Sequence, residues 1–131
     1  MAEHPHITVA SGFYDALAKG DLDDLRDRLL TDDVVFHVPG RGPLARDYQG
    51  KQEVLGYLAQ LSKATTGTLR LEPEDYLAGE DRVAAVLRIR GERDGRSLND
   101  HGMQLFRITD GKISERSSYP HDPYSVDEFF A

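Results

Sequence analysis

The chain changes its hydrophobic period at Thr68, and this change constrains the fold more than any other feature. Before Thr68, apolar residues recur every three or four positions, which is typical of amphipathic helices. After it, apolar and polar residues alternate, which is typical of strands. Asp94-Gly95 and Asp110-Gly111 interrupt the alternating part, and such pairs favour tight hairpin turns because glycine readily adopts a positive φ. The sequence therefore predicts helices followed by an antiparallel meander.

The boundaries follow from the periodicity and from the residues that stop or start elements. Helices are expected over residues 5–19, 21–30 and 51–64, with a short strand at 34–38 before the third helix. Four long strands are expected at 69–77, 82–93, 98–108 and 113–119. A last helical turn is expected at 125–130, where two phenylalanines should dock on the body or on a partner subunit.

Helices gathered on one side of a strongly curved antiparallel sheet make an α+β fold. Such a sheet, wrapped around three helices that precede its main strands, leaves a cone with an open mouth. Ligand sites favour concave, mostly apolar places of this kind. At 131 residues the chain is expected to form one domain over residues 1–131.

Composition excludes several classes of partner. The formal net charge is −7 and the calculated pI is about 5.1. This argues against nucleic acid or a membrane surface as the main partner, because both require a basic face. The chain has no cysteine, and it shows no signal peptide or membrane-spanning run, so the cytoplasm is the expected location.

Three stretches carry a resemblance to a known family. They are residues 18–58 (AKGDLDDLRDRLLTDDVVFHVPGRGPLARDYQGKQEVLGYL), 107–115 (RITDGKISE) and 119–130 (YPHDPYSVDEFF). In this order they resemble the nuclear transport factor 2-like superfamily and, within it, the SnoaL-like (polyketide cyclase-like) branch. The resemblance implies the cone-shaped fold, a cystatin-like α+β roll. It does not choose a function, because the superfamily includes isomerases, cyclases, dehydratases, hydrolases and non-catalytic binding modules.

The resemblance can be carried over residue by residue. Ketosteroid isomerases of this superfamily use a tyrosine, an aspartate base and a protonated aspartic acid. The corresponding positions here hold Phe13, Val38 and Gln104. Because all three chemical groups differ, ketosteroid isomerase activity is not expected. Cyclases of the SnoaL type use a carboxylate near the last strands, and neither Glu115 nor Asp122 clearly matches its position.

His37 is the first candidate for chemistry, because an imidazole titrates near neutral pH and suits general acid/base work. Alternation puts His37 opposite Phe36 and Val38. If those two residues face the pocket, His37 lies on the other face of the strand and makes a hydrogen bond there. Both interpretations stay open.

Asp100 is the second candidate. Alternation places Asp100, Gly102, Gln104 and Phe106 on one face of their strand. If Gln104 faces inward, Asp100 does too, nearer the mouth, where a carboxylate in an apolar site could act as a base. The alternative is a solvated residue at the start of the strand.

The glycine- and proline-rich loop after residue 38 is expected to form the mouth of the pocket. Arg41 and Arg46 could clamp an anionic group there, or could be solvated or paired with Asp47. No metal site is expected, since the histidines and acids show no recognised ligand spacing.

The sequence thus predicts a pocket for a small, largely apolar molecule, with no cofactor. Catalysis, if present, would be acid/base chemistry of an isomerase, cyclase or lyase type with His37 or Asp100 as proton carrier. The alternative is a non-catalytic dimeric binding or interaction module that pairs through its sheet. The residues expected to line the pocket are Phe13, Leu17, Phe36, Val38, Tyr57, Leu58, Leu61, Gln104 and Phe106.

Overall fold

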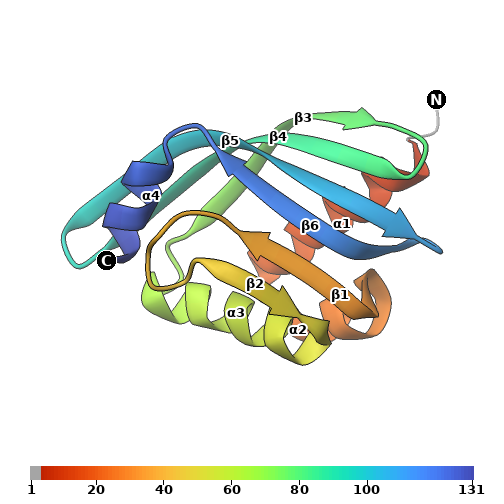
Figure 1. Ribbon diagram of the computed structural model, residues 1–131, viewed down its shortest axis with the longest axis horizontal. Helices are drawn as coiled ribbons and strands as arrows, with labels where there is room; N and C mark the ends of the chain where they lie inside the picture. Colours follow the sequence, from red (N-terminus) through yellow and green to blue (C-terminus); the bar gives the residue numbers. More distant parts are fainter. Residues whose placement is uncertain (1–3) are drawn as a thin grey trace.

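A computed structural model describes residues 4–131 and shows one curved sheet with helices packed on one of its faces (Figure 1). We call the face that packs against the helices the inner face, and the other the outer face. This arrangement confirms the predicted α+β class. The sheet has six strands in the order β2-β1-β6-β5-β4-β3.

Helix α1 (Pro5–Lys19) begins with a proline in its first turn and ends at Gly20, whose φ of +68° is favourable for glycine. Ala10, Phe13 and Tyr14 form its buried stripe. The predicted helix over residues 21–30 is wrong in detail, because it divides into α2 (Leu22–Asp24) and a π-helical turn, η1 (Leu25–Leu29).

The sheet begins with β1 (Leu30–Val38), which is longer than expected. The strands after α3 are β3 (Arg70–Ala78), β4 (Arg82–Arg93), β5 (Arg96–Thr109) and β6 (Lys112–Pro120), and they form the predicted antiparallel meander. Asp94 and Gly95 both have positive φ, as do Asp110 and Gly111, so both hairpin turns are confirmed.

Two pairings were not expected from the sequence. Residues 46–49 form a short strand, β2 (Arg46–Gln49), antiparallel to β1, where a loop was predicted. β1 also pairs in parallel with β6, which joins the β1–β2 pair to the meander in one open sheet. β2 forms because the buried Tyr48 anchors it, and the Tyr48 hydroxyl donates a hydrogen bond to the carbonyl oxygen of Leu44.

Helix α3 (Gly50–Ala64) packs beside β1, while α4 (Pro123–Phe130) packs near the β4–β5 hairpin (Figure 1). As predicted, the C-terminal phenylalanines dock on the body, where Phe129 is fully buried and Phe130 packs partly buried against the core. Between α1 and the sheet, the rings of Phe13, Phe36 and Phe106 meet edge to face. No helix within residues 4–131 is long and apolar enough to span a membrane.

Candidate functional site

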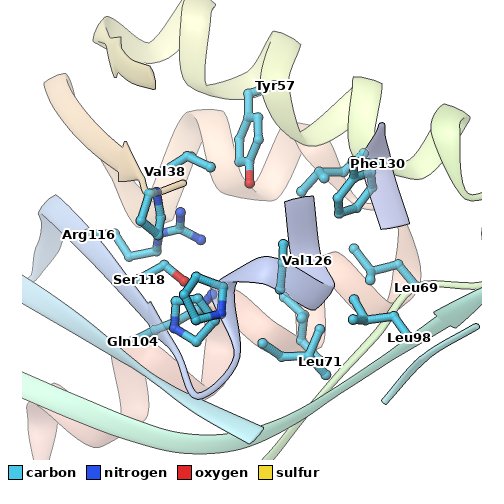
Figure 2. Close-up of a pocket in the computed structure, with 15 residues that line it drawn as sticks. Val38, Tyr57, Leu69, Leu71, Leu98, Gln104, Arg116, Ser118, Val126 and Phe130 are labelled. Carbon is cyan, nitrogen blue, oxygen red and sulfur yellow. The ribbon is translucent and has the colours of Figure 1, made fainter. Parts of the chain in front are cut away.

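A cavity lies between the inner face of the sheet, α3 and α4, and its volume is about 80 Å³. Figure 2 shows its lining side chains converging from these elements. The walls are mostly apolar, with four polar side chains among them. The lining residues are Val38, Pro39, Tyr57, Leu61, Leu69, Leu71, Ile89, Leu98, Gln104, Arg116, Ser118, Pro120, Pro123, Val126 and Phe130.

Arg116 is the most unusual of these residues. It is only 3% exposed, and its guanidinium carbon lies 4.5 Å from the centre of the Phe36 ring. Two of its nitrogens, Nε and Nη2, have no hydrogen-bond partner among residues 4–131, and they are the only buried side-chain polar atoms there without one. Burying a charge without a partner is costly, so this arrangement requires an explanation.

A bulge in β6 directs Arg116 inward. Arg107 pairs with Glu115, but the next residue, Ile108, pairs with Ile113, so that β6 contains one additional residue, Ser114. Such an insertion reverses which side chains face the core beyond it. Ile113 and Arg116 are therefore both buried, although strict alternation from Ile113 would place Arg116 on the outer face.

Tyr57 reaches the cavity from α3, and its hydroxyl points toward the Arg116 guanidinium (Figure 2). Burial raises the pKa of Tyr57, while the charge of Arg116 and a hydrogen bond from it act in the opposite direction. A tyrosine is protonated at neutral pH, and a raised pKa does not change that, so the Tyr57 hydroxyl is available as a donor.

Gln104 reaches the cavity from β5 and is held by Tyr14. The Tyr14 hydroxyl donates to Oε1 of Gln104 over 2.6 Å, and burial raises the pKa of Tyr14 far above its ordinary range. This bond occupies the carbonyl end of the Gln104 amide. The group that Gln104 can offer to a ligand is consequently its NH₂, which is a donor.

A second, larger cavity of about 530 Å³ lies between α1, α3 and β3. Its lining includes Leu17, Leu58 and the N-terminal part of β3, and it shares Leu61, Leu69 and Leu71 with the first cavity. Apolar surface thus runs from the space beside Arg116 to the space between the helices.

The structure divides the nine residues predicted to line the pocket into three groups. Val38, Tyr57, Leu61 and Gln104 line the smaller cavity, whereas Leu17, Leu58 and again Leu61 line the larger one. Phe13, Phe36 and Phe106 are fully buried in the core and line neither space.

His37 lies on the outer face of β1 and lines neither cavity. Its Nδ1 lies 2.8 Å from Asp47 Oδ1, and its Nε2 lies 2.7 Å from Glu115 Oε2. Hydrogen bonds to Asp47 and then to Glu115 raise the pKa of His37, and the bond from His37 lowers the pKa of Glu115. The geometry matches the outward-facing interpretation of His37, and a catalytic role for it stays a prediction.

Asp100 faces inward with Gln104, as alternation predicted, and is only 6% exposed. Its Oδ2 accepts a hydrogen bond from the backbone N–H of Asp122, just before α4, and its Oδ1 lies 3.9 Å from His121 Nδ1. Asp100 therefore holds the start of α4 against the sheet and does not line the cavity. Its catalytic role also stays a prediction.

The loop after β1 is held against α4, and α4 forms one wall of the cavity. The Asp127 carboxylate accepts hydrogen bonds from the backbone N–H groups of Arg41 and Gly42. Gly40 has a φ of +101°, and a Cβ there would collide with the Asp127 carboxylate, so this contact requires glycine. Arg41 and Arg46 are exposed, and Arg46 pairs with Glu53, which leaves neither at the cavity.

The sequence did not point to Arg116, Ser118 or the three cavity-lining residues of α4. A signal for Arg116 exists only across strands, because Arg116 is opposite Phe36 on β1 and Phe106 on β5, two fully buried rings. Within residues 4–131, no group of three or more His, Cys, Asp or Glu side chains is arranged to hold a metal ion.

Comparison with known proteins places this geometry in context. Residues 10–116 match the SnoaL-like domain. The uncharacterized protein Rv0034 of Mycobacterium tuberculosis is 30% identical over 132 residues, which cover the whole of both chains.

Two solved structures share the fold over nearly their whole length. Bal32a, from a soil-derived mobile gene cassette, is 25% identical with a TM-score of 0.93 and covers 97% of each chain. A protein of unknown function with a cystatin-like fold from Xanthomonas campestris is 30% identical with a TM-score of 0.90, covering 96% of this chain and 98% of that one.

Proposed function

Because the chain belongs to the SnoaL-like family, whose fold binds or transforms small molecules, we propose that it binds a small, largely apolar molecule inside its cone. The observation that carries this proposal is the apolar cavity beside Arg116, with Tyr57, Gln104 and Ser118 as convergent polar groups. Ligand sites are commonly concave and apolar, with a few polar groups that fix orientation.

Binding is better supported than catalysis. Among the described residues, the lining of the cavity beside Arg116 includes no Asp, Glu or His. Abstraction of a proton from a bound ligand needs a base within hydrogen-bond reach or one water away. An isomerase, cyclase or lyase reaction would therefore require Asp100 to leave Asp122, or the ligand to supply its own base.

Titration with 2-naphthamide, a neutral apolar probe, tests the proposal. A ligand of about a dozen non-hydrogen atoms is expected to bind with a Kd between roughly micromolar and millimolar. Chemical-shift titration of the ¹⁵N-labelled protein covers this range, and the shifts should gather on α3, α4 and the inner-face residues of β3 and β5.

Leu71→Trp fills space that both cavities share and should raise the Kd for 2-naphthamide at least tenfold. Leu77→Trp, on the same strand but 60% exposed on the outer face, is the matched control and should leave the Kd unchanged. Binding that Leu71→Trp does not weaken, in a protein that melts like wild type, would contradict the proposal.

A homodimer formed through the outer face is a second candidate function. Leu77, Met103 and Tyr119 are exposed there, and Met103 and Tyr119 are paired neighbours on β5 and β6. Tyr119→Glu should convert a dimer to a monomer by light scattering and leave 2-naphthamide binding intact. A wild-type chain that is already monomeric at high concentration would exclude this role.

A further inference from the structure

We infer that the ligand of this cavity carries a carboxylate, which Arg116 binds through Nε and Nη2. The inference rests on the proposed function, since it assumes that the cavity is a ligand site, and it adds the chemical class of that ligand. An apolar monocarboxylic acid, aromatic or aliphatic, has the required form.

The buried charge of Arg116 favours an anionic ligand. A guanidinium is charged at every physiological pH, so Arg116 cannot avoid the cost of burial by losing its proton. A buried charge is ordinarily paired, and Arg116 forms no ion pair with a carboxylate among residues 4–131. A ligand carboxylate would supply the missing counter-charge.

The nearby acidic side chains are engaged elsewhere. Glu115 precedes Arg116 but points to the outer face, where it pairs with His37 and lies 3.6 Å from Arg107 Nε. Asp100 is the buried carboxylate on the inner face of β5, and it accepts the Asp122 N–H at the start of α4. Neither can neutralise Arg116 without breaking a contact that the fold uses.

The geometry of the two free donors favours a carboxylate. Nε and Nη2 lie along one edge of the planar guanidinium, and such a pair of donors matches the two oxygens of a carboxylate. The ring of Phe36, 4.5 Å from the guanidinium carbon, limits how that plane can turn. Both free nitrogens therefore belong to the edge that binds a carboxylate in a bidentate manner.

The surrounding polar groups also favour a ligand that accepts hydrogen bonds. The free end of Gln104 is a donor because Tyr14 occupies its oxygen, and the protonated Tyr57 hydroxyl is a donor as well. The apolar part of the acid would lie along Leu61, Leu69 and Leu71, which lead to the larger cavity.

The test compares 2-naphthoate with 2-naphthamide, which have nearly the same shape and differ in charge. Wild type should bind the acid at least tenfold more tightly than the amide at pH 7. Because the pair is buried, this preference should change little between low and high salt. This comparison needs no substitution and therefore does not depend on whether a variant folds.

Three variants assign the preference to one residue. Arg116→Met removes the charge and keeps most of the volume, and it should bind acid and amide equally. Arg116→Lys keeps the charge but loses the bidentate edge, so it should retain part of the preference. Arg107→Met is the matched control, since Arg107 is 47% exposed on the outer face, and it should behave like wild type.

The outcomes separate this inference from the proposed function. If wild type binds acid and amide equally, or if Arg116→Met keeps the full preference, the carboxylate inference is wrong while the pocket stands. Equal binding would mean that water satisfies Arg116 in the complex. If neither probe binds, the proposed function fails and the inference fails with it.

Discussion

Arg116 and His37 lie on neighbouring strands of one sheet but on opposite faces, and their surroundings differ sharply. His37 has a carboxylate at each ring nitrogen and a side chain that is 37% exposed. Arg116 is buried over Phe36, and no carboxylate within residues 4–131 pairs with it. The protein itself supplies a carboxylate to both ring nitrogens of His37, whereas it supplies none to the Arg116 guanidinium.

This difference indicates which of the two side chains can still gain free energy from binding a ligand. An exposed, fully paired group such as His37 has little interaction energy left for a ligand, because its partners and water already satisfy it. A buried donor without a partner gains most from a ligand that supplies one, since the cost of removing it from water has already been met in folding.

Removal of the Phe36 ring, which lies beneath Arg116 on the inner face, should have the largest effect on stability. Phe36→Ala deletes a fully buried ring that meets Phe13 edge to face. The variant should lose about 3–5 kcal/mol of unfolding free energy in urea melts. Its outer-face counterpart on the next residue, His37→Ala, should lose less than about 1 kcal/mol. Equal losses would contradict the contrast between the faces.

Removal of the unpaired charge of Arg116 should have the next largest effect on stability, and this effect should have the opposite sign. Arg116→Met should raise the unfolding free energy of the ligand-free protein by about 1–3 kcal/mol, because an apolar side chain replaces a buried charge. Thermal denaturation should then show a melting temperature several degrees higher. Arg107→Met should be nearly neutral, and a lower melting temperature for Arg116→Met would show that the charge is already compensated.

Loosening of α4 should admit water to Arg116 and so reduce the difference between the inner and outer faces. Asp127→Ala removes two hydrogen bonds to the loop after β1 and should cost about 1–2 kcal/mol. Hydrogen exchange should become faster in α4 but not in β4. The preference for 2-naphthoate should decrease at the same time, because water that reaches Arg116 screens its charge. An unchanged preference would mean that α4 does not shield the site.

The smallest expected effect is the pH dependence of folding stability that His37 and Glu115 produce on the outer face. Because the pKa of His37 is raised in the folded state, its contribution to folding stability is complete below its ordinary pKa of 6.5. This contribution disappears as the pH rises through the folded-state pKa. The lowered pKa of Glu115 means that its contribution is present above 4.5 and disappears as the pH falls through the folded-state pKa. Both operate together between those ordinary values.

His37→Gln should therefore be less stable than wild type by about 0.5–1 kcal/mol near pH 5.5, after allowance for solvent screening. The difference should shrink as the pH rises above 7. Urea melts of both proteins across this range measure it. A difference that grows with pH would have the wrong sign for a charged His37 and would contradict the assignment.

Much of the fold followed from local sequence signals. The two Asp-Gly turns positioned three strands, and the stripe through Ala10, Phe13 and Tyr14 positioned the first helix. The π turn at 25–29 and the strand at 46–49 were not predictable in this way, because each depends on burial against distant parts of the chain.

The site was less predictable than the fold, and the bulge at Ser114 is the physical reason. Alternation works only while the register is unbroken, and one additional residue in β6 turns Arg116 from the outer face to the inner one. His37 and Asp100 attracted attention through their residue types, but Arg116 acquires its significance from its surroundings.

The parallel pairing of β1 with β6 has a consequence for how the chain is made. β1 and β2 leave the ribosome early and can pair with each other, yet β1 meets its second neighbour, β6, only after residues 112–120 have been synthesised. A pairing between such distant segments is slow to form, because a long loop must close before any contact stabilises it. Until then the apolar side of β1 and the stripes of α1 and α3 lack their sheet. Nascent chains that stall before β6 should therefore depend on chaperones more than chains that include it.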